Sequence, residues 1–467
     1  MFKRIFSLEK CLKEDQIQGS LPTDQEIYKD YWSVAWPAAL EGIFLNLILL
    51  ADLVMVGKLG IAMAAAVGIV SQPKMIMQMI GKSLGTGVTA VISRRKGEGR
   101  EQDMNSCIWQ SFLITLAVYV VLVGLGFHFR HGIMWLMGAN AEYIDFAVTY
   151  FSYLLIALFF KALSSILTAV ETGIGKTKIV LQASVVGNLV NIALNYCLIF
   201  GKFGFLRLEI KGAAIATIAG EIVIFVILLY SVLFRNREDG IDPLHCGRKG
   251  LSREVMKPVL TVGGNAFFEQ TFERIGLFLF ARIIAELGTV AVGTHHYCTI
   301  IWDMYYYFGM GMGTSSSSFA GRKVGERRPD LAILYNKAAQ RLGIVISIAV
   351  SILMILTRSS LFGLLVTDAE SMRLGSNILI LVAVIIIPQT QGQILAGALR
   401  GTGDNRFIAI YSLFVSAILR SVLAFFFAFG MGLGLYGMWV ALLIDEILKM
   451  VLTEYRIRKG IWLRRTI

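Results

Sequence analysis

Charge is scarce in this chain. Of its 467 residues, 16% are Asp, Glu, Lys or Arg, whereas 56% are apolar, and the mean hydropathy is +0.67. A water-soluble domain is about a quarter charged, so this chain lacks the polar side chains to cover two or three soluble domains. Twelve membrane-spanning helices of about 20 residues would use about 240 residues. The shortage of charge excludes an ordinary soluble protein and predicts a polytopic membrane protein.

Cysteine is also scarce. The five cysteines are scattered, odd in number and form no CxxC pair, so neither a disulfide framework nor a zinc site is expected. Catalytic motifs are missing as well. The run 173–177 resembles the end of a P-loop, but Val170 stands where the first glycine belongs and the run follows an apolar span. We therefore expect a turn at 173–177, no enzymatic activity and no cofactor.

The first 30 residues contain neither a long apolar run nor a small-residue cleavage site. A cleaved signal peptide is therefore not expected. Two interpretations of this cytoplasmic tail stay open. Its apolar and basic residues recur at helical spacing, which suits a short helix on the inner leaflet, and a solvated tail explains them equally well.

Long apolar runs recur along the chain, rich in Leu, Ile, Val, Ala and Gly. They are long enough to span a membrane as helices, whereas a transmembrane barrel shows segments of about 10 residues with alternating polarity. We predict an all-α protein with twelve transmembrane helices. They fall near residues 31–57, 66–92, 107–127, 143–170, 179–200, 212–234, 257–286, 289–319, 337–357, 375–398, 407–429 and 433–455.

The positive charges predict the orientation. With the N-terminus inside, the tails and even-numbered loops carry 30 of the 44 Lys and Arg residues, the odd-numbered loops 7 and the spans 7. Positive side chains concentrate in cytoplasmic loops. We therefore expect both termini in the cytoplasm and the chain in the cell (plasma or inner) membrane. The net charge of +12 reflects this bias, and no nucleic-acid partner is expected.

An internal repeat occurs at a constant offset of 228 residues. Glu41 aligns with Glu269, and Leu59-Gly60 aligns with Leu287-Gly288. The further matching positions are Gly81, Gly85 and Thr86 with Gly309, Gly313 and Thr314; Arg94, Gly97, Glu98 and Arg100 with Arg322, Gly325, Glu326 and Arg328; and Gly173 and Gly175 with Gly401 and Gly403. Shared membrane composition does not explain these matches, because Glu and Arg are rare in spans.

The repeat predicts the domain organisation. Six helices per half is an even number, so both halves enter the membrane from the same side as parallel repeats. The polar segment between them contains Gly and Pro and is interpreted as a linker. We expect a cytoplasmic tail at 1–30, an N-lobe at 31–234, a linker at 235–256, a C-lobe at 257–455 and a second cytoplasmic tail at 456–467.

Carboxylates inside the spans are the first candidate functional residues. An ionisable side chain at a helix centre costs about 2.5–3.5 kcal/mol on insertion scales and usually has a function. The candidates are Glu41 and Asp52 in the first span, Glu269 and Glu273 in the seventh, and Asp303 in the eighth. Such an acid exchanges a proton or, when ionised, binds Na⁺. The alternative is pairing with intramembrane cations, for which Lys161, Arg274, Arg282 and Arg420 are available; we favour pairing for Glu221 and Glu446.

Amide side chains are the second group. Asn191 and Asn195 share one face of the fifth span, and Gln389 follows Pro388 in the tenth. Buried amides either form hydrogen bonds between helices or serve as neutral ligands of an ion. Both interpretations stay open at this point.

Three segments together resemble the multidrug and toxic compound extrusion (MATE) family. They are WPAALEGIF…LADLVMVGKLG in the first span, TGIGKTK…NLVNIALNYCLIFG through the fifth, and GALRGTGDNR after the tenth. The resemblance covers the chain from residue 30 onward. It implies two six-helix bundles in a V-shaped arrangement. It also implies exchange of cationic, often aromatic compounds for Na⁺ or H⁺.

The resemblance also implies roles for individual residues. Asp52 occupies the family's acidic position in helix 1, and Glu273 and Tyr306 occupy cation-site positions of the NorM-type branch. Glu269 resembles the helix 7 acid of other branches, and Gln389 replaces the NorM-type helix 10 acid. In archaeal and DinF-like members an Asn and an Asp on helix 5 help to form an ion site. Here the matching positions are Asn191 and Asn195, which Thr217 could complete. Na⁺ is thus expected either at Glu273 with Tyr306 or at Asp52 with the two asparagines.

The sequence therefore predicts a monomeric secondary antiporter that exports small organic cations and contacts membrane lipid. The alternative is a flippase for a lipid-linked sugar, which needs a cationic cavity that Lys161, Arg274 and Arg282 would supply. A receptor or scaffold without transport would leave the duplicated buried acids unexplained.

Overall fold

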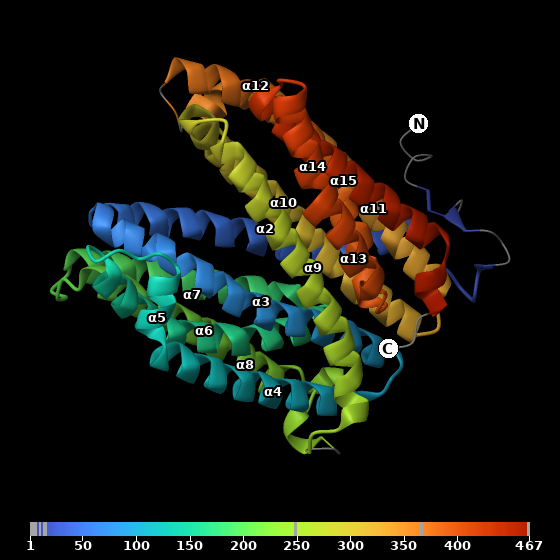
Figure 1. Ribbon diagram of the computed structural model, residues 1–467. Helices are drawn as coiled ribbons and strands as arrows, with labels where there is room; N and C mark the ends of the chain where they lie inside the picture. Colours follow the sequence, from blue (N-terminus) through green and yellow to red (C-terminus); the bar gives the residue numbers. More distant parts are fainter. Residues whose placement is uncertain are drawn as a thin grey trace. The chain divides into compact units, whose positions relative to one another are not determined.

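The computed structural model describes residues 7–8, 11–12, 16–246, 250–363, 366 and 368–464. In this part of the chain the regular elements are all helices and no strand occurs, which confirms the all-α prediction (Figure 1). The first half contains α2 (Asp24–Gly57), α3 (Ile61–Gly97), α4 (Glu101–His128), α5 (Arg130–Leu136), α6 (Ile144–Gly173), α7 (Thr177–Phe200), α8 (Glu209–Tyr230) and three short helices, η3 (Ser231–Arg235), η4 (Arg237–Asp239) and η5 (Pro243–His245).

The second half repeats this order of long helices. It contains α9 (Arg253–Ala285), α10 (Thr289–Gly325), α11 (Pro329–Gly363), α12 (Ala369–Gly401), α13 (Asn405–Tyr411), η6 (Ser412–Leu419), α14 (Arg420–Phe425), η7 (Phe426–Gly430), α15 (Gly434–Arg458) and η8 (Ile461–Arg464). The segments η6 and η7 are π-helical. Together with α13 and α14 they make one continuous helical segment.

Every predicted span lies within a long helical segment to within one residue at each end, and most helices extend beyond the apolar run. The helix α3, for example, continues through Arg94 and Lys96 to Gly97. Among the described residues, eight segments are long and apolar enough to cross a membrane: α3, α4, α6, α7, α8 with η3, α11, α12, and α13 through η7. The other four predicted spans, in α2, α9, α10 and α15, are also long helices, but their crossing of the membrane stays a prediction.

The chain divides into two compact units. The first-repeat unit is Phe44–Gly263, and the second-repeat unit is Met1–Ile43 together with Gly264–Ile467. The division falls inside α2 and inside α9, so each repeat exchanges the start of its first helix with the other. It therefore differs from the lobe boundaries expected at 31–234 and 257–455, which follow chain order.

Packing explains the exchange. Within the second-repeat unit, the Tyr31 hydroxyl on α2 donates a hydrogen bond to the Met312 carbonyl on α10 at 2.8 Å. Within the first-repeat unit, Gly263 on α9 lies so close to α3 that an added Cβ would be 2.9 Å from the Ser83 carbonyl oxygen. These contacts depend on tertiary packing, so the hydropathy of the sequence does not predict them.

The repeat found in the sequence also appears in helix packing. In the first-repeat unit Gly85 on α3 lies against the Ser165 carbonyl on α6. In the second-repeat unit Gly313 on α10 lies against the Gln393 carbonyl on α12. Both pairs are related by the same offset of 228 residues. Small residues at these crossings allow the close backbone approach that stabilises helix pairs in membranes.

Turns between helices repeat in the same way. Gly175 and Gly403 have φ of 88° and 85°, a left-handed conformation that side chains with a Cβ rarely adopt. Each residue lies just after the end of a helix, α6 and α12 respectively. The interpretation of 173–177 as a turn rather than a phosphate-binding loop is therefore confirmed.

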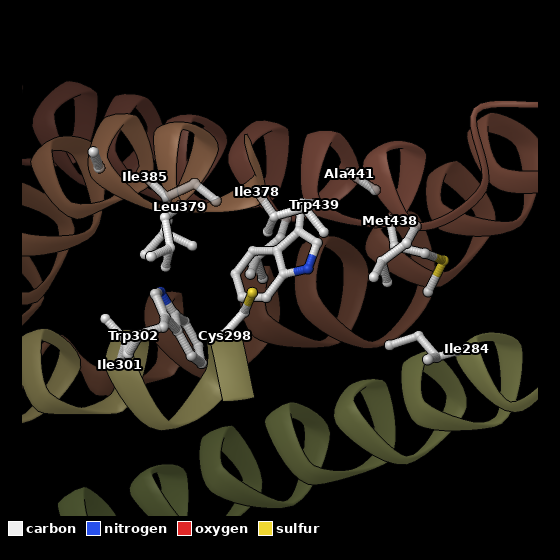
Figure 2. Close-up of a cluster of buried hydrophobic side chains, with 14 of the residues drawn as sticks. Ile284, Cys298, Ile301, Trp302, Ile378, Leu379, Ile385, Met438, Trp439 and Ala441 are labelled. Atoms are coloured by element: carbon white, nitrogen blue, oxygen red, sulfur yellow. The ribbon is translucent and has the colours of Figure 1, made fainter. Parts of the chain in front are cut away.

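Each unit has its own apolar core. In the second-repeat unit the core includes Trp302 on α10, Leu379 on α12 and Trp439 on α15, and Figure 2 shows Trp439 lying among Ile378, Leu379 and Cys298. In the first-repeat unit the core includes residues of α3, α6 and α8. These cores set the rotation of the helices that carry the polar side chains described below.

Candidate functional site

Three helices of the first-repeat unit bring Asp52 together with three neutral polar side chains. Asn195 on α7 donates through Nδ2 to Asp52 Oδ1 on α2 at 2.7 Å and to Asn191 Oδ1 at 3.2 Å. Asn191 Nδ2 donates to the Thr217 hydroxyl on α8 at 3.4 Å. That hydroxyl donates to the Ala213 carbonyl at 2.9 Å. Asp52 is thus the acceptor at the end of a continuous hydrogen-bond chain. We call these four side chains, Asp52, Asn191, Asn195 and Thr217, the Asp52 cluster.

The Asp52 cluster offers oxygen atoms without partners. Asn195 is 2% exposed, and its Oδ1 accepts no hydrogen bond from the described residues. A carboxylate accepts up to about four hydrogen bonds, whereas Asp52 Oδ1 receives one from the Asn195 amide. Carboxylate and amide oxygens are ligands of hard cations such as Na⁺. The arrangement is therefore chemically able to hold either a proton or a small cation at Asp52.

The lysines of the first-repeat unit interact with acids in different ways. Lys161 on α6 pairs with Glu221 on α8 at 3.0 Å, as expected for an intramembrane cation that neutralises an acid. Lys74 on α3 and the buried Tyr150 on α6 interact electrostatically with Asp52. No Lys or Arg nitrogen of the described chain, however, lies within 4.0 Å of the Asp52 carboxylate. None of the described Lys or Arg residues therefore serves Asp52 as a counter-ion in contact.

Glu273 in the second-repeat unit has the opposite environment. Its Oε1 lies 2.8 Å from Lys449 Nζ on α15 and accepts a hydrogen bond from the Ser416 hydroxyl on η6 at 2.8 Å. Its Oε2 lies 3.7 Å from Arg420 Nη1. The same two cations bind Asp445 on α15.

Glu446 completes this group, because Lys449 Nζ lies 3.4 Å from its Oε1. Arg420, Asp445 and Glu446 are at most 4% exposed, and Lys449 is 9% exposed. We call Glu273, Arg420, Asp445, Glu446 and Lys449 the Glu273 network. It contains three carboxylates and two cations.

The π-helical segment η6 supplies a hydrogen-bond donor to the Glu273 network. A π-helix inserts an extra residue per turn and frequently marks functional sites. Here it turns Ser416 toward Glu273. The helix α9 approaches this segment through Gly276, where an added Cβ would lie 2.5 Å from Arg420 Nη2 and clash with the Ser416 carbonyl oxygen. Any larger residue at 276 would push these two helical segments apart.

Tyr306 and Gln389 also lie inside the second-repeat unit. Tyr306 on α10 interacts electrostatically with Glu273 and packs against Trp302, with ring centroids 5.6 Å apart. Gln389 on α12 is fully buried, and neither its amide oxygen nor its amide nitrogen has a hydrogen-bond partner among the described residues. Among the described residues no hydrogen bond joins Tyr306 to Glu273, and none joins the Gln389 amide to the Glu273 network. A shared cation site at Glu273 and Tyr306 stays a prediction.

The two carboxylates matched by the repeat, Glu269 and Glu41, lie in the same unit. Glu269 on α9 forms an ion pair with Arg400 on α12, in the RGTGDN segment. Its Oε2 also accepts a hydrogen bond from Arg400 Nε at 3.4 Å. Glu41 is half-buried on α2. The pairing of Glu269 favours a packing role, although Arg400 was not among the cations expected to provide it.

Sequence reasoning missed several members of these clusters. Asp445 and Lys449 lie in the last span at helical spacing with Glu446, a run of three charges that was itself a detectable signal. Lys74 follows Pro73 in the second span and was detectable in the same way. Arg282 pairs with Glu286, four residues later, at 2.9 Å, and this pair is exposed.

Comparison with known proteins identifies the family. The MatE family profile matches residues 37–197 and 266–449, which is most of the chain. The uncharacterized transporter YisQ of Bacillus subtilis (strain 168) is 25% identical and aligns over 93% of this chain and 95% of its own. The probable multidrug resistance protein NorM of Thermotoga maritima is 24% identical and aligns over 96% of both chains.

Solved structures agree with this fold. An outward-facing multidrug resistance MATE family transporter of the MOP superfamily superposes with a TM-score of 0.87 at 22% identity, covering 93% of this chain and 96% of its own. A MOP superfamily transporter from Pyrococcus furiosus superposes with a TM-score of 0.86 at 22% identity, covering 94% and 97%. The long apolar helices and the family match agree that this is an integral membrane protein. The chain therefore belongs to the MatE family, whose members are transporters and not enzymes.

Proposed function

We propose that this protein is a secondary active multidrug efflux antiporter. It exports small organic compounds, often cationic and aromatic, in exchange for H⁺ or Na⁺. Relatives along nearly the whole chain carry the name multidrug resistance protein, among them NorM of Thermotoga maritima and MdtK of Edwardsiella ictaluri. This supports the substrate class.

The observation that carries the proposal is the Asp52 cluster. A carboxylate in a long apolar segment, hydrogen-bonded to a buried amide and without a cation in contact, suits reversible binding of an ion. Thr217 and Asn191 orient the amide that contacts it. Glu273 with Tyr306 is the second candidate for the same role, since both lie inside the other unit.

The mechanism follows from competition for one negative site. An organic cation and a coupling ion cannot both neutralise the Asp52 carboxylate, so binding of one favours release of the other. Two repeats that alternate in exposing such a site to each side of the membrane then produce exchange. The positive charge of the tails and even-numbered loops favours cytoplasmic termini in the cell membrane. A single chain supplies both repeats, so the mechanism requires only a monomer, with no nucleic acid and with lipid as its surroundings.

The flippase alternative has less support. It requires unpaired cations for a diphosphate, but Lys161 pairs with Glu221 and Arg282 pairs with Glu286. Arg274 is the remaining cation named for that role, and it interacts electrostatically with Asp303. Two of the three cations are therefore already neutralised by carboxylates.

The test is ethidium efflux from liposomes that contain the purified protein, under an imposed pH gradient and then under a Na⁺ gradient. The antiporter predicts accumulation or release driven by one of these gradients and abolished by its collapse. Efflux driven by one gradient alone names the coupling ion. Movement of ethidium that ignores both gradients, or no movement under either, would contradict the proposal.

A further inference from the structure

Lys449 is held like a bound cation. Its Nζ lies 2.8 Å from Glu273 Oε1, 2.9 Å from Asp445 Oδ2 and 3.4 Å from Glu446 Oε1. An ammonium has three N–H donors, and three carboxylates from two helices, α9 and α15, surround this one. The three oxygens lie where they would also coordinate a free monovalent cation.

The lysine is anchored on its own helix. The Thr453 hydroxyl donates a hydrogen bond to the Lys449 carbonyl at 2.6 Å, and Asp445 and Glu446 lie one turn earlier on α15, at i−4 and i−3. Such spacing places their side chains beside the ammonium. The site therefore carries its counter-ion covalently attached.

An attached cation has a large advantage over a dissolved one. Its effective concentration is set by the side-chain tether and reaches the molar range or above, whereas a dissolved coupling ion is present at about 0.1 M. The N–H donors also form charge-assisted hydrogen bonds with the carboxylates, which bare Na⁺ cannot replace with the same geometry. Na⁺ can therefore bind here only if the ion pairs of Lys449 are broken, which costs free energy. Binding of Na⁺ at the Asp52 cluster breaks no such ion pair.

The charge balance supports the same conclusion. With all groups ionised, the three carboxylates and two cations of the Glu273 network sum to −1. Loss of the Lys449 charge would change this sum to −2, with Arg420 as the remaining cation. Asp52 in the first-repeat unit, by contrast, has no Lys or Arg nitrogen of the described residues within 4.0 Å.

We propose that Lys449 is a built-in counter-cation that occupies the cation position of the Glu273 network, so that exchange of the coupling ion takes place at Asp52 in the first-repeat unit. The second half of this statement rests on the antiport function proposed above; the first half does not. Lys449 is on this view a specificity-determining residue, because it decides that the second carboxylate site takes up no free ion.

The experiment measures Na⁺ binding without transport. Purified protein in detergent is unfolded by heat while NaCl replaces choline chloride at constant ionic strength. The Asp52→Asn background removes the first candidate ion site. We expect no Na⁺-specific shift in this background, and a saturable rise in Tm of about 2–4 °C when Lys449→Gln is added. Adding Glu273→Gln as well should abolish the rise, and Lys449→Arg in place of Lys449→Gln should give none.

Two results would overturn the proposal. One is a Na⁺-dependent rise in Tm in the Asp52→Asn protein that disappears in Asp52→Asn/Glu273→Gln, since Glu273 would then bind Na⁺ with Lys449 in place. The other is a folded Lys449→Gln protein that gains no response to Na⁺. Should Lys449→Gln fail to fold, the comparison of Asp52→Asn with Asp52→Asn/Glu273→Gln decides alone, and equal absence of a Na⁺ response supports the proposal. Because no step depends on efflux, failure of the antiport function would leave this readout intact.

Discussion

Carboxylates in the predicted spans differ in whether a cation contacts them. Glu269, Glu273 and Glu221 each contact the side chain of a Lys or Arg, whereas Asp52 contacts an amide. A buried ion pair whose partners satisfy each other resists protonation and release, so it suits a structural role. A carboxylate whose neighbour is a neutral amide breaks no ion pair within the protein when it exchanges its ion, so the exchange costs less free energy. Asp303 on α10 likewise has no Lys or Arg nitrogen of the described residues within 4.0 Å, so it is the hydrogen-bonded amides that distinguish Asp52.

The Glu269–Arg400 pair is predicted to stabilise the fold. Its side chains are 12% and 20% exposed, and removal of one partner leaves a charge in a poorly solvated place. We expect Glu269→Gln to cost about 3–5 kcal/mol, and the double variant Glu269→Gln/Arg400→Gln to cost less than the sum of the single variants. Thermal unfolding in detergent measures both.

The matched control is the exposed pair of Arg282 and Glu286, whose side chains are 71% and 56% exposed. Glu286→Gln should change stability by about 0–1 kcal/mol. If Glu269→Gln lowers the free energy of unfolding no more than Glu286→Gln does, the Glu269–Arg400 pair does not stabilise the fold and Glu269 has some other role.

Residue pairing was the least predictable part of the site. Asp52, Asn191, Asn195 and Thr217 could be named because polar side chains in apolar spans are conspicuous. Which of the cations would meet which acid depends on the rotation of each helix about its axis, which is set by packing of the core around residues such as Trp439. For this reason Arg400 was not expected to meet Glu269.

At the scale of the helices, apolar runs predicted all the long elements, because a lipid-facing backbone must be helical to satisfy its own hydrogen bonds. The helix ends were predicted less well, since charged turns such as that around Arg94 and Lys96 extend α3 beyond its apolar run. The π-helices η6 and η7 were not predicted at all. Their sequences are as apolar as those of their neighbours, so hydropathy does not distinguish them.

Gly276 is predicted to be essential for the contact between α9 and η6. In Gly276→Ala the new Cβ would meet the Ser416 carbonyl oxygen and Arg420 Nη2. Overpacking of this kind costs about 1–3 kcal/mol, and we expect a correspondingly lower Tm. Gly264→Ala, on the same helix but with nothing within 4 Å of its added Cβ, is the control. Equal Tm values for the two variants would show that the helices separate without strain.

The segment after α8 is bound to the rest of the first-repeat unit by ion pairs and hydrogen bonds of Asp239 and Asn236. Asp239 on η4 forms ion pairs with Lys96 and Lys176, and Asn236 donates to Glu171 at 2.8 Å while accepting from Lys176 at 2.8 Å. Partial burial raises the pKa of Asp239, but hydrogen bonds from Lys176 and Lys96 lower it more, so the net shift is downward.

This lowered pKa predicts how the stabilisation from the Asp239 ion pairs depends on pH. A carboxyl group with a lowered pKa stabilises the fold above its unfolded pKa of about 3.9, and the stabilisation is lost as the pH falls through the folded pKa. Asp239→Asn should therefore cost about 0.5–1 kcal/mol equally from pH 6 to pH 8. Thermal unfolding at several pH values, with the exposed Glu238→Gln as control, measures this cost. A cost that changes between pH 6 and pH 8 would contradict the assignment.

For the whole molecule, the sequence repeat predicted the recurrence of helix order and packing, because aligned glycines must serve aligned crossings. It did not predict that the starts of α2 and α9 pack with the opposite repeat. That exchange depends on contacts such as Tyr31 with Met312, between residues nearly 300 positions apart. Hydropathy depends on consecutive residues, whereas the compact units depend on contacts between residues that are distant in the sequence.

The central claim is that Asp52 couples export to the ion gradient. The most direct measurement is gradient-driven ethidium efflux from liposomes containing either Asp52→Asn or the control Glu286→Gln, at equal amounts of folded protein. We predict that Asp52→Asn reduces efflux to the level of empty liposomes, because an amide neither exchanges a proton nor neutralises a cation, and that Glu286→Gln keeps wild-type efflux. Gradient-driven efflux that persists in folded Asp52→Asn would contradict the account.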